Sequence, residues 1–472
     1  MKTISESDRI KNEYSSYLKD ESNLSGFSDK ILIIEDPAEI NDIIRNYQLN
    51  KIPVTVSNGR TGTTGGCVPL NTDLLTLERL NKVKDMEKDT LTVESGISLQ
   101  EIESFLEKEN PEMFYPVDVT ESTSRIGGNI ATDASGSRSF FYGSTRDWIL
   151  ACKIVLPDGR ELEINRGTTF AQGFCAEILD HHFTLPDIKV IPVKNTAGYY
   201  IKNNMDLIDL FIGSEGTLGI ITQVKLKLSD RVPGLINFLC FFPKEENALN
   251  FFKEIISWDN LYSIEFFDKH SIQILSEDLP LKGESALYFE IQDPNRLEEI
   301  SRLIQSHHSD LASTWMGENN REKNRIRDFR HKLPEKINAL ISERKRAFPQ
   351  IHKIGTDIAI PFNKLSQMID FYYRTMQKET MLFALFGHIG EAHLHLNMIP
   401  DNRPQFERAK KLHEIFIRQA VSWGGTFAAE HGVGKIKKPF MKYLFTPEEI
   451  DGMAAVKKTL DPNLILNPGV MF

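Results

Sequence analysis

Strand-like and helix-like patterns of apolar residues alternate through the first half of the chain. In "DTLTVESG" apolar residues stand at alternate positions, as in a half-buried strand, and "SLQEIESFLEKEN" then has helical spacing. Ser98 and Glu101 are placed to form a capping box at the start of that helix. "WILACKIVLPDGRELEI" predicts two strands around a Pro-Asp-Gly turn, and "GTLGIITQVKLKL" predicts a strand with one apolar face. Together they predict one sheet layer in a first domain, residues 1–232.

After Gly234 the pattern changes to strands followed by long helices. "INFLCFF", "YSIEFFD" and "ALYFEIQ" are strand-like, whereas "ALNFFKEIISW" and "LEEISRLIQSH" are helix-like. Such a run predicts an antiparallel sheet with helices on one face, an α+β plait. The charged stretch 316–338 predicts a solvated helix with its preceding loop. The second domain is therefore expected over 233–425, followed by a C-terminal segment over 426–472.

One further helix is expected in "PQFERAKKLHEIFIRQAVSWGG". Phe406, Leu412, Phe416 and Ala420 have the spacing of a buried helical stripe, and the glycine pair after Trp423 marks the end of the helix. This helix leads the chain directly into "TFAAEHGVGK".

Composition narrows the class of protein. The formal charge of −10 excludes a nucleic-acid partner, because phosphate binding needs a basic face. No stretch has the composition of a signal peptide or approaches the roughly 18 apolar residues of a membrane span. We therefore expect a cytoplasmic protein, with any membrane contact peripheral and at the inner face. The four cysteines are far apart, which excludes a zinc ribbon or an iron–sulfur module within this chain.

Two segments are rich in glycine and hydroxyl side chains. "SNGRTGTTGGC" (57–67) follows the strand-like "KIPVTV", and residues 114–148 carry a second cluster. Each could be an ordinary connection, or its bare backbone could let a phosphate approach the amide N–H groups. Neither contains the Gly-Lys-Ser/Thr ending of a P-loop or the order of elements of a Rossmann unit. The pattern suits a diphosphate that is held and never cleaved.

The histidines gather in the second half of the chain, since none precedes His181. In "LFGHIGEAHLHLN" a strand would place His393 and His395 on one face, with His388 nearby. With Glu430 of "AAEHGVGK", two or three imidazoles match the ligand set of Zn²⁺, Mn²⁺ or Fe²⁺. The alternative is a set of hydrogen-bonded core histidines. His431 is a candidate general base, because the ordinary pKa of histidine lies near neutral pH.

Six motifs in order resemble those of one family. They are "RTGTTGG", "TSRIGGNIATDASG", "KNTAGYY" with "LFIGSEGTLGIIT", "GHIGEAHLHLN", "EHGVGK" and "DPNLILNPG". Over nearly its whole length the chain resembles the FAD-linked oxidases and dehydrogenases with a p-cresol methylhydroxylase-type flavin domain. Within them it is most similar to the D-2-hydroxyacid dehydrogenases of the D-lactate, glycolate and D-2-hydroxyglutarate types. The resemblance implies an FAD-binding domain, an antiparallel α/β plait cap domain for the substrate, and a C-terminal segment that returns to the flavin.

The resemblance also implies a set of FAD contacts. The loop 57–66 would wrap the pyrophosphate, and residues from about 116 to 136 would line the flavin and its ribityl chain. Gly216 and Ile221 would lie along the adenine side, and Asn467 would reach the isoalloxazine. The implied FAD-binding residues are Ser57, Asn58, Gly59, Arg60, Thr61, Gly62, Gly65, Gly66, Pro116, Thr123, Gly127, Gly128, Asn129, Ala131, Ser135, Gly136, Gly216, Ile221 and Asn467. Where the resembling proteins usually have Arg-Gly, this chain has Ser57-Asn58, and Arg60 replaces a glycine. The Arg60 side chain either restores the lost positive charge or points to solvent. Without a histidine before His181 no histidyl–flavin link can form, so FAD should be non-covalent and Cys67 structural.

For catalysis, the resemblance implies a divalent metal, Zn²⁺ or Mn²⁺, on His388, His395 and Glu430. His431 matches the base, and Arg330 matches a carboxylate-binding arginine; the alternative is that Arg330 is a solvated charge on a helix. The implied reaction oxidises a D-2-hydroxyacid to the 2-oxoacid by hydride transfer to flavin N5. His393 stands where relatives often have asparagine. Relatives that act on dicarboxylates carry a basic residue before the strand "DIAIP", and its absence from "IGTDIAIP" favours a short monocarboxylate substrate.

Other readings remain open on the sequence. An alkyl-dihydroxyacetone-phosphate synthase-type transferase shares the flavin domain, but Glu430 counts against it because such proteins usually have a second histidine there. A metal-dependent hydrolase would leave both glycine-rich segments unexplained, and an inactive binding or scaffold protein would leave the site residues unexplained. The electron acceptor could be a quinone, an electron-transfer flavoprotein, an iron–sulfur subunit or a cytochrome.

Overall fold

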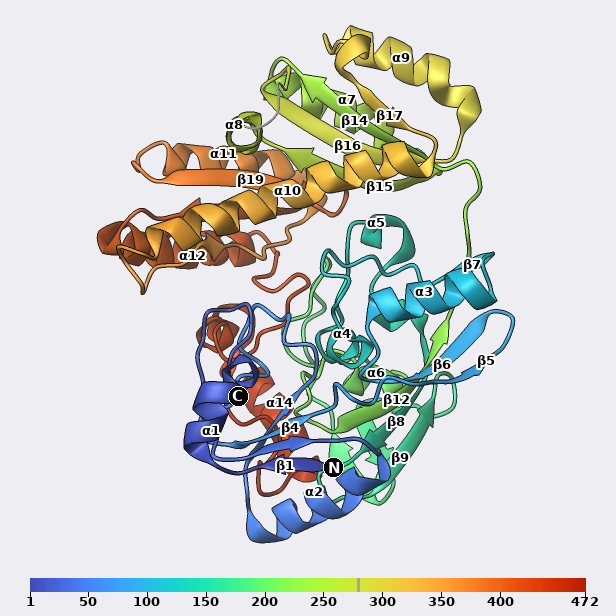
Figure 1. The fold of residues 1–472 in the computed structure, drawn as a ribbon, viewed down its shortest axis with the longest axis vertical. Helices are drawn as coiled ribbons and strands as arrows, with labels where there is room; N and C mark the ends of the chain where they lie inside the picture. Colours follow the sequence, from blue (N-terminus) through green and yellow to red (C-terminus); the bar gives the residue numbers. More distant parts are fainter. Residues whose placement is uncertain (278–280) are drawn as a thin grey trace.

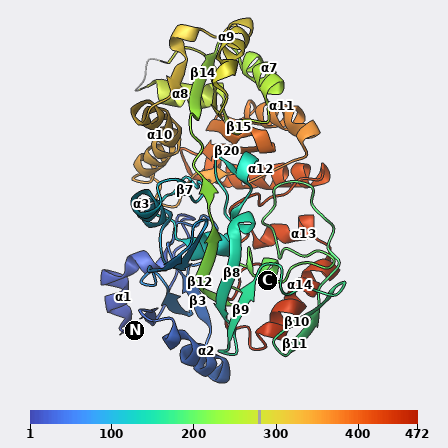
Figure 2. The ribbon, with the colours of Figure 1, turned by 90° about the vertical axis from the view of Figure 1, so that its right-hand side faces the viewer.

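The computed structural model describes residues 1–277 and 281–472. Figure 1 shows two parts stacked along the long axis of the molecule. The lower part, residues 1–230 and 426–472, contains both termini, and the upper part, residues 236–422, is built around one large sheet. Figure 2 shows the same two parts from the side.

Two sheets form most of the lower part. In the smaller one, β1 and β2 are antiparallel, whereas β2, β4 and β3 are parallel neighbours. Its strands in spatial order are β1 (Lys2–Ile4), β2 (Ile31–Ile33), β4 (Asp73–Thr76) and β3 (Val54–Ser57). The larger sheet is antiparallel throughout, in the order β5 (Val83–Met86), β6 (Thr90–Glu94), β12 (Ile220–Lys227), β8 (Ile149–Val155) and β9 (Glu161–Asn165). The strands predicted from alternation are confirmed, as is the apolar face of β12.

Two short pairs of strands complete the lower part: β7 (Met113–Phe114) with β13 (Ser229–Asp230), and β10 (Cys175–Ile178) with β11 (His181–Thr184). Its helices are α1 (Ser7–Glu13), α2 (Ala38–Asn50), α3 (Leu99–Glu109), α4 (Ile126–Thr132), α5 (Ser139–Tyr142), α6 (Ile208–Phe211), α13 (Met441–Leu444) and α14 (Pro447–Leu460). The predicted capping box of α3 is confirmed, because the Ser98 side chain accepts from the Glu101 amide and the Glu101 side chain accepts from the Ser98 amide.

The upper part is one antiparallel sheet of seven strands. Their spatial order is β17 (Trp315–Gly317), β14 (Ile236–Phe242), β16 (Ser285–Ile291), β15 (Leu261–Phe267), β19 (Leu382–His388), β20 (His393–Ile399) and β18 (Ile354–Gly355). Its helices are α7 (Glu245–Ile255), α8 (Lys269–Ser276), α9 (Leu297–Ser306), α10 (Asn320–Arg344), α11 (Leu365–Met376) and α12 (Arg403–Ser422).

Helices cover both faces of this sheet, so the expectation of helices on one face was wrong. Along β14, Phe238 packs in a core with α7 and α9, whereas its neighbour Leu239 packs in a separate core with α8 and α10. Every residue of β14, β15 and β16 is buried. A continuous apolar run such as "INFLCFF" is the pattern of a strand buried on both faces.

Helix α10 also differs from the prediction of a solvated helix. Ile326, Phe329, Leu333, Ile337 and Ile341 form a buried stripe against the sheet. Their spacing of three or four residues is helical, but the dense charges between them obscured it. The expected end of α12 before the glycine pair is confirmed, since that helix ends at Ser422.

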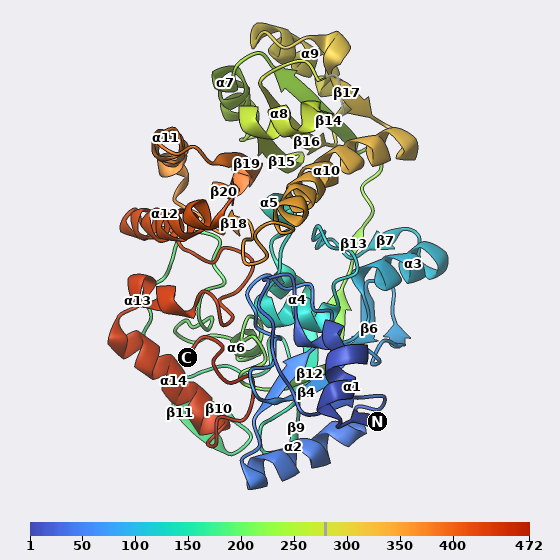
Figure 3. The same cartoon turned by 60° about the vertical axis from the view of Figure 1, so that its left-hand side comes forward.

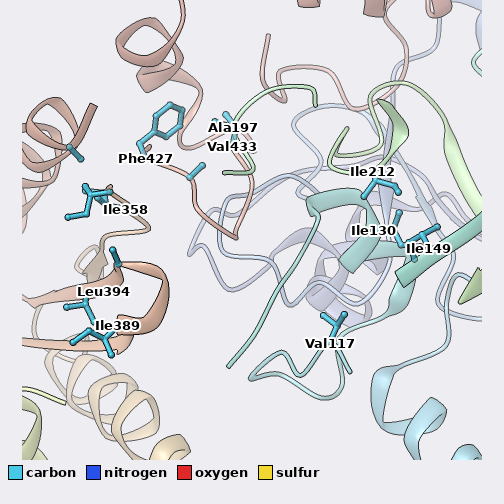
Figure 4. Close-up of a cluster of buried hydrophobic side chains, with 14 of the residues drawn as sticks. Val117, Ile130, Ile149, Ala197, Ile212, Ile358, Ile389, Leu394, Phe427 and Val433 are labelled. Carbon is cyan, nitrogen blue, oxygen red and sulfur yellow. The ribbon is translucent and has the colours of Figure 1, made fainter. Parts of the chain in front are cut away.

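One hydrophobic core joins the two parts. In Figure 4, Ile130 and Ile149 lie at one side of this cluster and Ile389 and Leu394 at the other, with Val433 between them. The C-terminal segment, red in Figure 3, leaves the upper part after α12 and returns to the lower part. There Leu466 forms a parallel bridge to Val54, so the end of the chain lies beside the loop that follows β3. Within residues 1–277 and 281–472, no helix combines the length and the apolar character that a membrane crossing requires.

Candidate active site

A cavity of about 340 Å³ lies in the lower part, where the loop after β3 meets α4 and the C-terminal segment. Most of the predicted FAD-binding residues line it: Asn58, Gly59, Arg60, Thr61, Gly62, Gly66, Gly128, Asn129, Ala131, Ser135, Gly216 and Asn467. Asp20 and Glu215, which sequence reasoning missed, also line it, as do Glu430 and His431. The structure therefore brings both glycine-rich segments and the "EHGVGK" motif to one cavity.

The remaining predicted residues, Ser57, Gly65, Pro116, Thr123, Gly127, Gly136 and Ile221, lie outside this lining. Two of these glycines instead permit close packing. A Cβ at Gly127 would lie 2.7 Å from the Ser95 Cβ, and one at Gly136 would lie 1.7 Å from the Asp118 carbonyl oxygen. In contrast, a Cβ at Gly128 would meet no atom within 4 Å. Gly128 thus faces open space in the cavity.

One feature of the cavity, the side chain of Asn58, suits a bound cofactor. The Asn58 side chain donates to the Ser95 carbonyl at 2.8 Å, but its buried Oδ1 has no hydrogen-bond partner among the described residues. A buried acceptor without a partner costs about 1–3 kcal/mol, which a bound donor would offset.

Arg60 neither points to solvent nor offers an unpaired charge, because its guanidinium lies 2.9 Å from Glu78 and stacks on Tyr17.

The C-terminal segment is tied to the wall of the cavity by backbone hydrogen bonds. The amides of Lys435 and Ile436 donate to the Thr64 carbonyl at 3.0 and 3.1 Å. The Glu215 carboxylate accepts from the Val433 and Gly434 amides at 2.7 and 2.8 Å. These contacts hold the turn that carries Glu430 and His431 against the cavity.

Three histidines of the β19–β20 hairpin converge on Glu430. The distances from Glu430 carboxylate oxygens are 3.5 Å to His388 Nε2, 3.8 Å to His393 Nδ1 and 3.2 Å to His395 Nε2. The ligand atoms that these four residues offer all lie within 4.8 Å of one another, a geometry that could hold a metal ion. The structure therefore brings His388, His395 and Glu430 together and adds His393 to them.

Charge in this cluster favours a cation. Burial lowers the pKa of His388, but Glu430 and Glu265 outweigh burial and raise it to about 9. The ion pairs around the histidines join four carboxylates, Glu265, Asp357, Glu391 and Glu430, to three cations, Lys194, Arg330 and Lys437. Protonated His388 supplies the fourth positive charge, so a metal ion bound at this imidazole would replace its proton and leave the carboxylates compensated.

Lys194 and Asp357 are the main site residues that sequence reasoning missed. Lys194 Nζ lies 2.9 Å from Glu430 and 3.0 Å from Glu391, and this charge, with the histidines, holds the pKa of Glu430 well below its usual range despite burial. Asp357 accepts from the amides of Glu430 and His431 at 3.2 and 3.1 Å. Both lie in motifs that the sequence displays, "KNTAGYY" and "DIAIP", but nothing in their spacing places them beside a histidine.

His431 lies between the cluster and the cavity. Its side chain is 37% exposed, whereas the other site histidines are buried or nearly so. Its Nδ1 is 3.5 Å from Asp357, and its Nε2 is 3.5 Å from Glu430. Burial lowers its pKa below the ordinary value of histidine, although both carboxylates oppose this. A neutral imidazole at the edge of a cavity can accept a proton.

Arg330 lies on α10 and faces the same cluster. Its Nε and one terminal nitrogen bind the two oxygens of Glu265 at 2.6 and 3.0 Å, and Glu265 in turn lies 3.2 Å from His388. Its neighbours Arg325 and Arg327 are exposed. The guanidinium is therefore not the solvated helix charge of the alternative interpretation. Two of its N–H groups already donate hydrogen bonds to the Glu265 carboxylate.

Comparisons with known proteins bear on the family of this chain. A family model described as "FAD linked oxidases, C-terminal domain" matches residues 236–471, and one described as "FAD binding domain" matches residues 28–165. The chain is 29% identical to a D-2-hydroxyglutarate dehydrogenase of Xanthomonas citri, with 92% of this chain and 87% of the relative covered. It is 26% identical to the glycolate oxidase subunit GlcD of Bacillus subtilis, with 94% and 89% covered, and 26% identical to a D-lactate dehydrogenase of Anaerostipes hadrus, with 91% and 86% covered.

A solved structure of an alkyldihydroxyacetonephosphate synthase has the same fold. It matches with a TM-score of 0.65 at 17% identity and covers 94% of this chain and 77% of that one.

Proposed function

This chain belongs to the FAD-linked oxidases, a family of flavin-dependent oxidoreductases, and on that premise we propose that it oxidises a D-2-hydroxyacid to the 2-oxoacid. The observation that carries the proposal is that Glu430 and His431, consecutive residues, both line the cavity while Glu430 is also the centre of the histidine cluster. A cofactor in the cavity and a substrate at the cluster would thus meet at this pair. The names of the relatives, which include D-2-hydroxyglutarate, glycolate and D-lactate enzymes, support the substrate class.

FAD would be held in the cavity mainly by backbone amides of the loop after β3, with Gly128, Asn129 and Asn467 along its length. Bound FAD supplies the acceptor for the C2 hydride of the substrate. The attachment is non-covalent in this proposal. Cys67 lines the cavity, but burial raises the pKa of its thiol to about 12, so it is a poor nucleophile.

A divalent metal, Zn²⁺ or Mn²⁺, would be held by His388, His395 and Glu430. Such an ion supplies a Lewis acid that lowers the pKa of the substrate hydroxyl. The side chains around it have fixed orientations. The His395 Nδ1–H donates to the Thr356 carbonyl at 3.1 Å, which directs its Nε2 toward Glu430.

His431 would take the hydroxyl proton at Nε2. Asp357 lies beside Nδ1 and favours the tautomer with the proton there, which leaves the Nε2 lone pair on the side of Glu430. The same carboxylate accepts from the His431 amide, so Asp357 positions both the backbone and the ring.

The substrate carboxylate would bind to Arg330. Its second terminal nitrogen has no hydrogen bond among the described residues, while Glu265 fixes the guanidinium. A planar guanidinium suits a carboxylate better than an ammonium does. Gly355 and Thr356, which precede Asp357, carry no charge, and this supports a short monocarboxylate rather than a dicarboxylate substrate.

The test is the anaerobic visible spectrum of the purified protein before and after D-lactate, D-2-hydroxyglutarate and glycolate, with L-lactate as the control. Bleaching of a flavin spectrum by one of these acids is expected. A flavin that none of them reduces would contradict the substrate class, and turnover of an acyl-dihydroxyacetone phosphate would instead support a transferase. Addition of quinone, electron-transfer flavoprotein or cytochrome c to the reduced enzyme would then identify the electron acceptor.

A further inference from the structure

We infer that His393 is a direct ligand of the metal ion proposed above, so that three imidazoles and one carboxylate hold it. This inference rests on the proposed function and extends it to a residue outside the implied ligand set. His393 stands where the resembling proteins often carry asparagine. The structure gives a physical reason for an imidazole there.

The first observation is the burial of an unpartnered nitrogen. His393 is 0% exposed, and neither of its ring nitrogens has a hydrogen-bond partner in the part of the chain that the structure describes, so Nδ1, which faces Glu430, is unsatisfied. The nearest carboxylate oxygen, on Glu430, is 3.8 Å away, which is too long for a hydrogen bond. A histidine kept only for packing would be expected to satisfy this nitrogen, since an unmade buried hydrogen bond costs about 1–3 kcal/mol. A metal ion between Nδ1 and Glu430 would satisfy it.

The second observation is that all three histidines follow one pattern. In each ring one nitrogen lies near a fixed oxygen: Glu265 at 3.2 Å for His388, Asp357 at 3.2 Å for His393 and the Thr356 carbonyl at 3.1 Å for His395. Of these contacts only that of His395 has the geometry of a hydrogen bond; the other two are ion-pair distances. The other nitrogen of each ring faces Glu430. Metal-binding histidines almost always have an acceptor of this kind on the nitrogen remote from the ion. His393 therefore has the same two-sided environment as its neighbours.

The third observation is the backbone that presents the rings. His388 and His393 are paired across the β19–β20 hairpin, and His393 and His395 lie two residues apart on one strand. The turn between them closes through Ala392, which has a φ of 50°. All three imidazoles thus project from one rigid hairpin, and the centroids of the His393 and His395 rings are 4.5 Å apart.

A third imidazole changes which metal the site prefers. Imidazole ligands favour Zn²⁺, Co²⁺ and Fe²⁺, whereas Mn²⁺ prefers carboxylate and water oxygens. We therefore expect the holoenzyme to bind Zn²⁺ at least about tenfold more tightly than Mn²⁺, and His393→Asn to narrow that difference. Loss of an outer-sphere partner alone typically weakens metal binding by about 10–100-fold, so loss of a ligand should weaken Zn²⁺ binding at least as much.

The experiment is equilibrium dialysis of the metal-depleted holoenzyme against buffered Zn²⁺ or Mn²⁺, with bound metal counted by mass spectrometry. X-ray absorption at the zinc edge then counts the imidazoles around the ion. The variants are His393→Asn, which restores the residue of the relatives, His395→Asn as a ligand of the proposed set, and His352→Asn as a half-buried histidine outside the cluster.

The inference predicts three imidazoles in the wild type and two in His393→Asn, with Zn²⁺ affinity lowered in that variant and unchanged in His352→Asn. Wild-type affinity and an unchanged imidazole count in His393→Asn, together with metal loss in His395→Asn, would overturn the inference and leave the proposed metal site intact. A wild type that binds neither Zn²⁺ nor Mn²⁺ would overturn both.

Discussion

The two sides of the candidate active site, the cavity wall and the histidine cluster, are built from different kinds of groups. The cavity wall consists largely of glycines, small polar side chains and backbone, and its two arginines are engaged elsewhere, Arg60 with Glu78 and Arg125 with the Gly96 carbonyl. The histidine cluster consists of buried ionisable side chains from both parts of the molecule. A wall of backbone tolerates changes of charge but not of volume, whereas a cluster of charges tolerates changes of volume but not of charge. The predictions below test that difference.

Removal of the metal should have the largest effect. Dialysis against a chelator should abolish turnover while the flavin stays bound, because Glu430 is the only proposed metal ligand that also lines the cavity among the described residues. Activity with the hydroxyacid and the flavin absorbance are measured before and after, and Zn²⁺ or Mn²⁺ is then restored. Full turnover in a sample that elemental analysis finds free of metal would contradict the metal site and would mean that the side chains of the cluster activate the substrate hydroxyl without a metal ion.

His431→Gln should lower kcat by about 10²–10⁴-fold, the usual contribution of a general base, and leave FAD binding unchanged. Glutamine keeps the volume and cannot accept the proton at neutral pH. Flavin reduction is followed by stopped-flow absorbance, and His352→Asn serves as a control away from the site. An unchanged rate of reduction would remove the base assignment.

Gly128→Leu should act in the opposite way, by filling the cavity without adding charge. A side chain there meets no protein atom at its Cβ, so it would enter the cofactor space, at a cost of about 1–3 kcal/mol or roughly 5- to 150-fold in FAD affinity. Because Gly128 lies within α4, the FAD-free protein should be no less stable. Gly128→Ala is the graded control, and FAD binding is measured by fluorescence quenching. Equal affinity in all three proteins would place the cofactor elsewhere.

The same contrast explains what the sequence could predict. Strands, helix caps and the two glycine-rich segments follow from local patterns, and the neighbourhood of His388, His393 and His395 follows from their spacing on one hairpin. The partners of those histidines could not be predicted, because Lys194, Glu265 and Asp357 come from distant strands and loops and meet only in the fold. Charge balance in a buried cluster is a property of the assembled structure rather than of any segment.

A pH effect is expected at a contact between the lower and upper parts of the molecule, outside both sides of the site. Arg138, beside the cavity segment, binds Glu290 of β16 at 2.7 and 3.1 Å. Burial alone would raise the pKa of Glu290, but the Arg138 charge outweighs it and holds the pKa below its ordinary value. Glu290 therefore stabilises the folded protein above the ordinary glutamate pKa of about 4.3, and this contribution is lost as the pH falls further.

In Glu290→Gln the decrease of the melting temperature between pH 5 and 3 should be shallower than in the wild type, since each unit of pKa difference is worth about 1.4 kcal/mol. Glu299→Gln, which removes an exposed pair with Arg296, should leave that slope unchanged. Parallel curves for Glu290→Gln and the wild type would mean that the pair adds no pH-dependent stability.

The smallest effect is expected at Arg60, one of the charged residues of the cavity wall. Arg60 lines the cavity, and a cation near a pyrophosphate would ordinarily be expected to matter, but its guanidinium is committed to Glu78, the Asn58 carbonyl and the Tyr17 ring. The double change Arg60→Met with Glu78→Gln removes both charges without leaving one unpaired. If backbone amides hold the cofactor, FAD affinity should fall by less than about tenfold, or 1.4 kcal/mol. A larger loss would show that this wall also depends on charge, and the contrast with the histidine cluster would then be one of degree.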